Sequence, residues 1–251
     1  QIWQDIFCSE LEAPQPLIQG FGDVYANPWK IELLELLQSN LPAHLNKGAL
    51  CVTGSQAVEF AIKTAFLATK SKGLICFEGG YHGLDLGVLP ITSRDDFRAP
   101  FSHVMDQSLV ERVPFACSME HICQAIDRLQ RRGVSTAAII CEPILGRGGV
   151  VSPPKSWLTE LKFICQQKGL LLIFDEVLTG LGRSGVFTHS EQVPCDILCL
   201  GKALGGGMPL SGVWARDELM DAWPQGQGEA IHTGTFFGHS LSCQVGFKTV
   251  K

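Results

Sequence analysis

The chain has 251 residues, of which 45% are hydrophobic and 18% charged, and it carries a formal net charge of -5. This length and composition predict a globular protein with one main domain and exclude a disordered or coiled-coil chain. The basic residues form no dense block and no run reaches the roughly 20 apolar residues of a membrane span, so the chain is expected to bind neither nucleic acid nor membrane and to be cytoplasmic.

The predicted elements alternate between helices and short apolar strands. Apolar residues recur at helical spacing over residues 28–41, and a second helix follows Thr53-Gly54-Ser55. A further helix is predicted over residues 155–168. Four short apolar runs flanked by turn residues predict buried strands, over residues 74–77, 137–141, 170–174 and 197–200.

Buried runs separated by helices are what a parallel sheet covered on both faces requires, and they predict an α/β fold with a mostly parallel central sheet. In open sheets of this kind, ligands bind at the carboxyl ends of the strands. The first candidates for a site are therefore the residues that directly follow the runs, which are residues 78–82, Glu142-Pro143, Asp175-Glu176 and Gly201-Lys202.

The ten cysteines are dispersed along the chain and form no C-x-x-C pair. The nearest pair, Cys195 and Cys199, is expected to bracket a buried strand, because a structural zinc site would need a second ligand pair. We therefore expect reduced, buried thiols and no metal site.

The segment Thr53-Gly54-Ser55 opens a helix, and the first backbone N–H groups of a helix have no partner inside it. Together with the positive end of the helix dipole, Gly54 and Ser55 form a candidate seat for a phosphate group. The alternative is an ordinary helix cap, because Ser and Thr are common at helix starts whatever the function.

The turn Gly80-Tyr81-His82-Gly83 follows the first strong strand and places an aromatic face and an imidazole at the same expected sheet edge. A planar ring could stack on Tyr81, and His82 is a candidate contact beside it. The alternative is a half-buried tyrosine at a turn.

The third apolar run ends in Asp175-Glu176 and delivers a carboxylate into a dry site, where an unpaired charge is costly. A protonated pyridine nitrogen would suit Asp175, because the carboxylate keeps that proton on the ring and lets the ring accept electrons. The same pattern also describes a magnesium-binding strand of a nucleotide hydrolase. That alternative requires a G-x-x-x-x-G-K-[ST] loop upstream, which this sequence lacks.

Lys202 follows the last apolar run and precedes three glycines at residues 205–207. An ammonium group there is costly unless it is paired or used chemically, and Schiff-base formation would use the amine as a nucleophile. The alternative is a surface lysine just past a strand. Each feature is modest alone, but Lys202, Asp175 and the seat at Gly54-Ser55 meet the separate requirements of one cofactor.

Five segments carry a family pattern: TGSQAVE at residues 53–59, GYHG at 80–83, EPILGRGG at 142–149, FDEVLTGLGRSG at 174–185 and GKALGGGMPL at 201–210. They resemble class III aminotransferases, the ω-aminotransferase group of fold type I pyridoxal-phosphate enzymes, and the last two matches are highly specific. The resemblance implies a three-layer fold type I large domain over residues 28–251, which binds the cofactor, after a partial N-terminal segment at residues 1–27.

The resemblance implies pyridoxal 5'-phosphate as the cofactor. Lys202 would hold it as a Schiff base and Asp175 would pair with its pyridine nitrogen, which makes these two the implied catalytic residues. Val177 would pack on the ring face opposite Tyr81. Thr235 would reach the phosphate of the neighbouring subunit, which implies a homodimer with shared active sites. With the patterns above, the predicted cofactor-binding residues are Gly54, Ser55, Tyr81, His82, Glu142, Asp175, Val177, Lys202 and Thr235.

The chain departs from the family pattern in several places. Leu178 stands where glutamine is usual, Gln56 where an acid is usual, and Ser240 where a proline usually follows the histidine. Leu178 bears on the reaction type, because the ring's electronics depend on hydrogen bonds near its phenolic oxygen. Arg147 lies where acidic or small residues are more usual, either as an anion contact or as an exposed loop arginine.

Members of this family continue into a small C-terminal domain, which this chain is expected to lack. The leading prediction is an aminotransferase that moves an amino group from an amine or amino acid to a keto or aldehyde acceptor, with Lys202 shuttling a proton. The alternatives are an aminomutase, racemase or decarboxylase of the same fold, and a truncated, non-catalytic cofactor-binding homologue.

Overall fold

A computed structural model describes residues 27–228 and 230–251, so the predicted N-terminal segment lies outside the described residues except for Asn27. The α-helices are α2 (Pro28–Asn40), α3 (Gly54–Thr69), α4 (Asp95–Arg98), α5 (Met119–Arg131), α6 (Trp157–Lys168), α7 (Asp217–Met220) and α8 (Ser240–Val250). The strands are β1 (Lys47–Cys51), β2 (Gly73–Phe77), β3 (Val110–Val113), β4 (Thr136–Cys141), β5 (Leu171–Glu176), β6 (Ile197–Leu200) and β7 (Ser211–Ala215).

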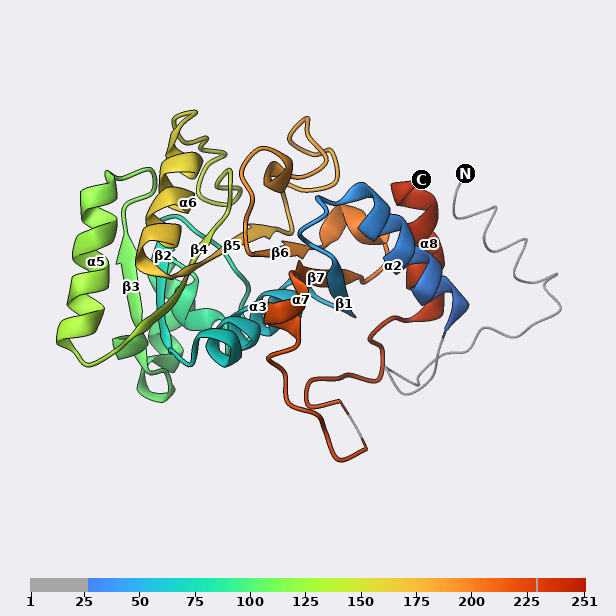
Figure 1. Cartoon of the computed structure of the whole chain (residues 1–251), viewed down its shortest axis with the longest axis horizontal. Helices are drawn as coiled ribbons and strands as arrows, with labels where there is room; N and C mark the ends of the chain where they lie inside the picture. The colour runs from blue at the N-terminus through green and yellow to red at the C-terminus, as the bar shows by residue number, and fades with distance from the viewer. Residues whose placement is uncertain (1–26, 229) are drawn as a thin grey trace, which may run out of the picture.

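The described strands form one sheet in the order β1-β7-β6-β5-β4-β2-β3 (Figure 1). Strands β3, β2, β4, β5 and β6 pair in parallel. Strand β7 is antiparallel to both β6 and β1, so β1 runs in the same direction as the parallel strands. The carboxyl end of β1, where α3 begins, therefore lies at the same sheet edge as the ends of β2, β4, β5 and β6.

Both faces of the sheet are buried, which explains why its central strands are continuous apolar runs. In β5, Leu172 and Phe174 join one core cluster, which α2, α5 and α6 cover. The alternate residues Leu171 and Ile173 join a second cluster, which α3 covers. The chain is therefore a three-layer α/β fold with a mostly parallel sheet, and the predicted fold class is confirmed.

Helices α2 and α8 lie side by side at one end of the sheet (Figure 1). The ring centroids of Trp29 and Phe247 are 6.1 Å apart in an edge contact. The side-chain amide of Asn27, which caps α2, also donates to the carbonyl of Gly238 at 3.2 Å and to the hydroxyl of Ser240. Ser240 thus joins the starts of the two helices, which gives this departure from the family pattern a structural role.

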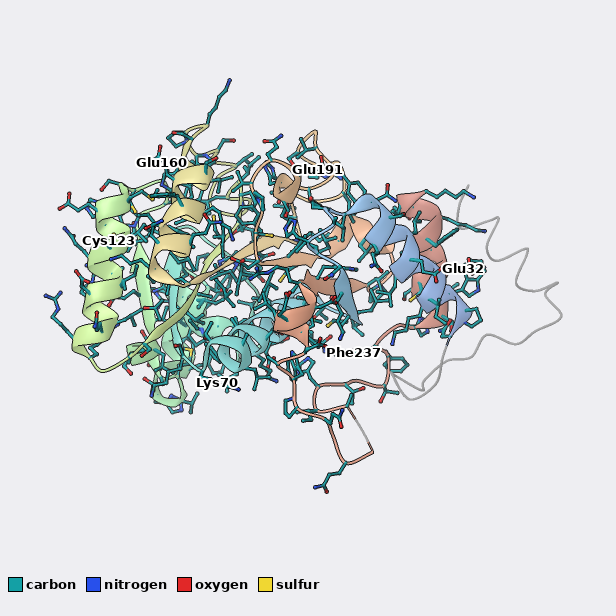
Figure 2. The ribbon with its side chains drawn as sticks, viewed as in Figure 1. Glu32, Lys70, Cys123, Glu160, Glu191 and Phe237 are labelled. Carbon is teal, nitrogen blue, oxygen red and sulfur yellow. The ribbon has the colours of Figure 1, made fainter. Side chains whose placement is uncertain are left out.

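The outer helices turn polar residues away from the core. On α6, Glu160 lies on the outside (Figure 2) while the next residue, Leu161, is fully buried. None of the cysteines in the described ranges forms a disulfide and most are buried, as predicted, although Cys117 and Cys123 are only partly buried. Within those ranges, no helix has the length and apolarity that crossing a membrane would require.

Candidate active site

The strand ends and the start of α3 surround one cavity of about 420 Å³. All but one of the predicted site residues line it, which are Gly54, Ser55, Tyr81, His82, Glu142, Asp175, Val177 and Lys202. Sheet register explains part of this convergence, because Asp175 on β5 pairs with Cys199 on β6, three residues before Lys202. Residues distant in sequence thus meet at one sheet edge, as parallel strands require.

The start of α3 leaves backbone donors available to a ligand. Thr53 caps the helix, since its hydroxyl accepts from the N–H of Gln56 at 3.2 Å. The side-chain oxygen of Gln56 accepts from the N–H of Thr53 at 3.1 Å, which completes a capping box. Gln56 therefore does the capping work of the usual acid. In the described part of the chain, the N–H groups of Gly54 and Ser55 donate to no acceptor, so they can receive an anion.

Gly83 keeps the space in front of Ser55 open. Its φ is +115°, and a Cβ atom at this position would lie 1.9 Å from the Ser55 Oγ. The Ser55 Oγ also accepts a hydrogen bond from the N–H of Leu84 at 3.2 Å, so the serine is held against this turn. The Gly83 turn and the helix start therefore form one unit.

We predict that Gly83→Ala lowers the free energy of unfolding by about 1–3 kcal/mol, because alanine is strained at this φ, and weakens phosphate-ester binding, because its Cβ displaces Ser55. Denaturant unfolding and titration with pyridoxal 5'-phosphate would measure the two effects. Gly133→Ala is the matched control, since Gly133 has a φ of +72° and an added Cβ atom there would meet nothing within 4 Å. Equal cofactor affinity in the two variants would contradict the role given to the Ser55 contact.

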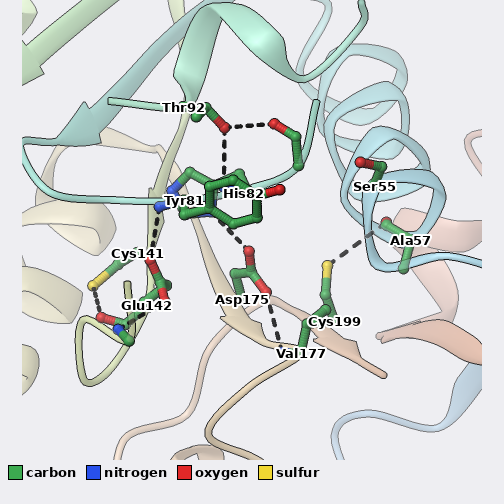
Figure 3. Close-up of polar contacts among 12 residues, drawn as sticks. Ser55, Ala57, Tyr81, His82, Thr92, Cys141, Glu142, Asp175, Val177 and Cys199 are labelled. Atoms are coloured by element: carbon green, nitrogen blue, oxygen red, sulfur yellow. Dashed lines mark hydrogen bonds and ion pairs between the residues drawn. The ribbon is translucent and has the colours of Figure 1, made fainter. Parts of the chain in front are cut away.

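Asp175 is only 4% exposed and already has an imidazole partner. Its Oδ2 atom accepts from Nδ1 of His82 at 2.7 Å (Figure 3), and its Oδ1 atom accepts from the N–H of Val177 at 3.1 Å. The backbone N–H of His82 donates to the hydroxyl of Thr92 at 3.1 Å, which itself donates to the carbonyl of Gly83 at 2.7 Å. The sequence indicates a cationic partner for Asp175, but it identifies neither this pair nor Thr92, because a single threonine carries no recognisable pattern.

Glu142 joins two parts of the cavity wall. One of its carboxylate oxygens accepts from the N–H of Tyr81 at 2.8 Å (Figure 3). The other accepts from the N–H of Gly146 at 3.1 Å. Burial, and then the nearby charge of Asp175, raise the pKa of Glu142 above its usual value. With both oxygens occupied by backbone donors, Glu142 positions the Tyr81 turn and the loop that follows β4.

Lys202 follows Gly201 and opens the short 3-10 helix η5 (Lys202–Gly205). Its φ is +40°, a region in which a residue with a side chain is strained by about 1–3 kcal/mol. Such strain gathers at functional sites, and sequence reasoning had no means of finding it here. The neighbouring Val177 fits against two glycines, since Cβ atoms at Gly54 and Gly201 would lie 2.8 and 3.1 Å from its Cγ1 atom.

Thr235 is the one predicted site residue that the structure does not bring to this cavity. It is exposed and lies in the segment before α8. Its neighbour Phe236 lines an adjoining cavity of about 250 Å³, which shares Val52, Met208 and Pro209 with the first. The expected contact of Thr235 with a neighbouring subunit's phosphate stays a prediction.

Leu178 and Arg147, which both depart from the family pattern, line the main cavity. Leu178 packs closely on the backbone of Gly146, where a Cβ atom would lie 1.9 Å from its Cδ2 atom. The guanidinium carbon of Arg147 lies 4.3 Å from the ring centroid of Tyr81. Arg147 is exposed to solvent, as one interpretation expected, and it also lines the cavity.

Glu176 is 1% exposed at the end of β5, behind Asp175. Its carboxylate accepts from the N–H of His189 at 2.7 Å and from the hydroxyl of Thr179 at 3.2 Å, yet burial raises its pKa from 4.5 to about 7. A raised folded-state pKa means that the folded protein binds this proton more tightly than the unfolded chain. The resulting stabilisation is complete below the unfolded pKa and is lost as the pH rises through about 7.

In the wild-type chain, Glu176 should lower the free energy of unfolding by up to about 3 kcal/mol as the pH rises from about 5 to about 8. We predict that Glu176→Gln abolishes this contribution. Glutamine stays neutral at both values, so it carries no such dependence. Urea unfolding at several pH values measures the slope, and Glu160→Gln on the outer face of α6 is the control. A Glu176→Gln variant with the wild-type slope would contradict the assignment.

The sequence and structure were compared with known proteins. The family model described as aminotransferase class-III matches residues 21–251. A curated acetylornithine aminotransferase from Methanopyrus kandleri is 40% identical over 225 residues, which cover 88% of this chain and 54% of that protein. The chain thus spans about half the length of this relative.

Two solved structures share the fold. An amine transaminase from an uncultivated Pseudomonas species, solved in its PLP-bound form, is 26% identical with a TM-score of 0.82, over 99% of this chain and 62% of that chain. An (S)-enantioselective ω-transaminase from Thermomicrobium roseum is 24% identical with a TM-score of 0.83, over 99% of this chain and 59% of that chain. Both are longer than this chain, and both cover its described fold.

Proposed function

We propose that this chain, which belongs to the class-III aminotransferases, binds pyridoxal 5'-phosphate and transfers an amino group from an amine or amino acid to a keto or aldehyde acceptor. The main support is that Lys202, Asp175 and the free backbone donors of Gly54 and Ser55 lie around one cavity. Membership of the family supports the cofactor, because class-III aminotransferases depend on pyridoxal phosphate.

The described residues fit this cofactor. The cavity of about 420 Å³ has the size of a small-molecule site. Unpaired N–H groups at the start of α3 suit its phosphate, and the buried carboxylate of Asp175 suits a protonated ring nitrogen. The face of Tyr81 and the side chain of Val177 can hold the two sides of a flat ring.

Each residue then has a separate task. When bound, the cofactor supplies an electron-accepting ring that stabilises negative charge on the substrate carbon. Asp175 would hold a proton at the ring nitrogen, and His82, which donates its Nδ1–H to Asp175, would keep that carboxylate in place. Lys202 would be the covalent attachment point for the cofactor, and its free Nζ would accept the proton that leaves the substrate carbon.

The proposal extends to the assembly and its setting. Residues 28–251 would form the cofactor-binding large domain of a cytoplasmic enzyme, with a homodimer that shares its active sites. The position of Thr235 supports the dimer. This residue is exposed and does not line the main cavity, but its neighbour Phe236 lines the adjoining smaller cavity. The partners would be small molecules, an amino donor and a carbonyl acceptor.

The other reactions of this fold receive less support. An aminomutase, racemase or decarboxylase would use the same attachment step, but the relatives that the chain matches are named aminotransferases and transaminases. The nucleotide-hydrolase interpretation rested on Asp175-Glu176 alone, and Asp175 pairs with His82 while Glu176 faces backbone and threonine donors.

A half-reaction assay tests transfer directly. The purified chain, loaded with pyridoxal phosphate, is mixed with a panel of amines and amino acids, and the visible band of the bound cofactor is followed while the carbonyl product is measured. We expect at least one donor to convert the band and release one equivalent of carbonyl product. A loaded protein that converts no donor would contradict transfer by this chain and favour a non-catalytic binding protein.

A further inference from the structure

Arg147 and Lys202 are the arginine and lysine side chains among the described residues that line the cavity, and Arg147 is the one that the proposed chemistry does not use. It lies in the loop after β4, and its guanidinium carbon is 4.3 Å from the ring centroid of Tyr81 and 5.9 Å from that of Phe97. A guanidinium that stacks on an aromatic face stays in one orientation and keeps its N–H donors free at its edges. The stacking therefore fixes where those donors can meet a ligand.

The loop that carries Arg147 is firmly held. Leu145 and Val151 exchange backbone hydrogen bonds at 3.0 and 3.1 Å and close the loop at its base. The carbonyl of Gly146 accepts from the N–H of Val150 at 3.1 Å, and the N–H of Gly146 donates to the carboxylate of Glu142 at 3.1 Å. Glu142 binds the Tyr81 turn with its other oxygen, so one buried carboxylate positions both the ring and the arginine that stacks on it.

No anion in the described part of the chain neutralises Arg147. The salt bridges there use other arginines and lysines, and the two carboxylates that line the cavity are already occupied. Asp175 pairs with His82, and Glu142 accepts from two backbone N–H groups. A cavity-facing guanidinium with no anionic partner can bind a carboxylate in a two-point contact.

The cavity wall next to Arg147 is apolar. Leu178 lines the cavity and packs on Gly146, the residue directly before Arg147. A ligand whose carboxylate meets the guanidinium would lay its aliphatic carbons along this leucine. The wall therefore offers a charged contact and an apolar contact side by side.

We propose that Arg147 is the residue that selects the substrate, by binding a carboxylate joined to a short aliphatic chain that packs on Leu178. This inference rests on the proposed function, since it assigns that site a substrate class: amino or keto acids with a carboxylate remote from the reacting carbon. Arg147 is a specificity residue, and the chemistry at Lys202 does not depend on it.

The test uses glutarate, a five-carbon dicarboxylate that cannot react, and its neutral diamide glutaramide. Their binding to the purified chain, with and without pyridoxal phosphate, is measured by calorimetry, and in the loaded protein also by the cofactor's visible band. The variants are Arg147→Gln and Arg147→Lys, with Arg131→Gln on the exposed face of α5 as a control that removes one positive charge elsewhere.

We expect the wild-type chain to prefer glutarate to glutaramide, and Arg147→Gln to weaken glutarate binding by about tenfold or more, since a hydrogen-bonded charge contact is lost. Glutaramide binding should not change, Arg147→Lys should keep part of the preference, and Arg131→Gln should behave as wild type. Added salt should weaken glutarate binding to the wild-type chain more than to Arg147→Gln.

Equal glutarate affinity of Arg147→Gln and the wild-type chain, or a wild-type chain without the preference, would overturn the inference. Failure of the proposed function has a different signature, which is a chain that takes up no cofactor on Lys202. The cofactor-free titration still decides the role of Arg147 in that case. Borohydride reduction and mass measurement of Arg147→Gln should still show the cofactor on Lys202, which separates a loss of glutarate binding from a loss of the cofactor.

Discussion

Lys202→Ala is expected to yield a folded protein that retains no pyridoxal phosphate covalently and has lost amino transfer. Lys202 lines the cavity and lies two residues after the end of β6, at the start of η5. Loss of its proton-carrying role alone should slow the half-reaction by about 10²- to 10⁴-fold, because general acid–base groups contribute factors of this size. Alanine also removes the covalent link, so the cofactor should be lost on gel filtration.

Lys202→Arg separates charge from chemistry. Arginine keeps the positive charge and the side chain's length, but its guanidinium stays protonated and does not attack a carbonyl. We expect Lys202→Arg to be as inactive as Lys202→Ala, and Lys155→Ala, which changes an exposed lysine before α6, to behave as wild type. A Lys202→Arg protein that keeps covalent cofactor would place the attachment point elsewhere.

Asp175→Asn is expected to leave cofactor binding detectable while the half-reaction slows by about 10²- to 10³-fold, as when a preorganised charge contact is removed from a site. Asparagine is neutral and cannot hold a proton at the ring nitrogen. It also changes the contact that Asp175 makes with Nδ1 of His82 at 2.7 Å. Single-turnover absorbance changes with one amino donor measure the rate, and cofactor titration measures the binding.

Asp196→Asn is the matched control for this variant. Asp196 is buried and accepts from Lys162 at 2.7 Å and from the N–H of Leu172 at 2.8 Å, away from the cavity. Its loss should lower the free energy of unfolding by about 1–3 kcal/mol without changing the half-reaction rate. A normal rate for Asp175→Asn would show that the carboxylate has been given the wrong role.

The sequence predicted the centre of the sheet and not its edges. Strands β2, β4, β5 and β6 are buried on both faces, so each is a continuous apolar run that composition alone reveals. Strand β7 begins with Ser-Gly and resembles a turn. Its Gly212, like Gly48 on β1, clears the space that the ring of Trp214 fills, which is a requirement of packing between strands far apart in the sequence.

The site followed the same division. Asp175 and Lys202 could be predicted because they lie at the ends of apolar runs, and Gly54-Ser55 because it opens a predicted helix; the structure places all of them around one cavity. The pairing of His82 with Asp175 spans 93 residues and depends on how the chain brings the turn after β2 next to the end of β5. The strained backbone of Lys202 is likewise a property of the fold that its residue type does not encode.

Two of the departures from the family pattern have structural roles, and a third lies on the cavity wall. Gln56 completes the capping box of α3, and Ser240 bonds with Asn27 between α2 and α8, so both have clear structural roles. Leu178 replaces a polar group with an apolar wall beside Gly146 and Arg147. An apolar side chain at this position changes the surroundings of a bound ligand. We therefore connect Leu178 with the choice of substrate.

Borohydride trapping decides whether Lys202 is the residue that holds the cofactor. The purified chain is incubated with pyridoxal phosphate, reduced with borohydride, digested and mapped by mass spectrometry. We expect a single stable adduct, on Lys202, at close to one equivalent per chain. An adduct spread over lysines outside the cavity, such as Lys155, or no adduct at all, would show that Lys202 is not the attachment point.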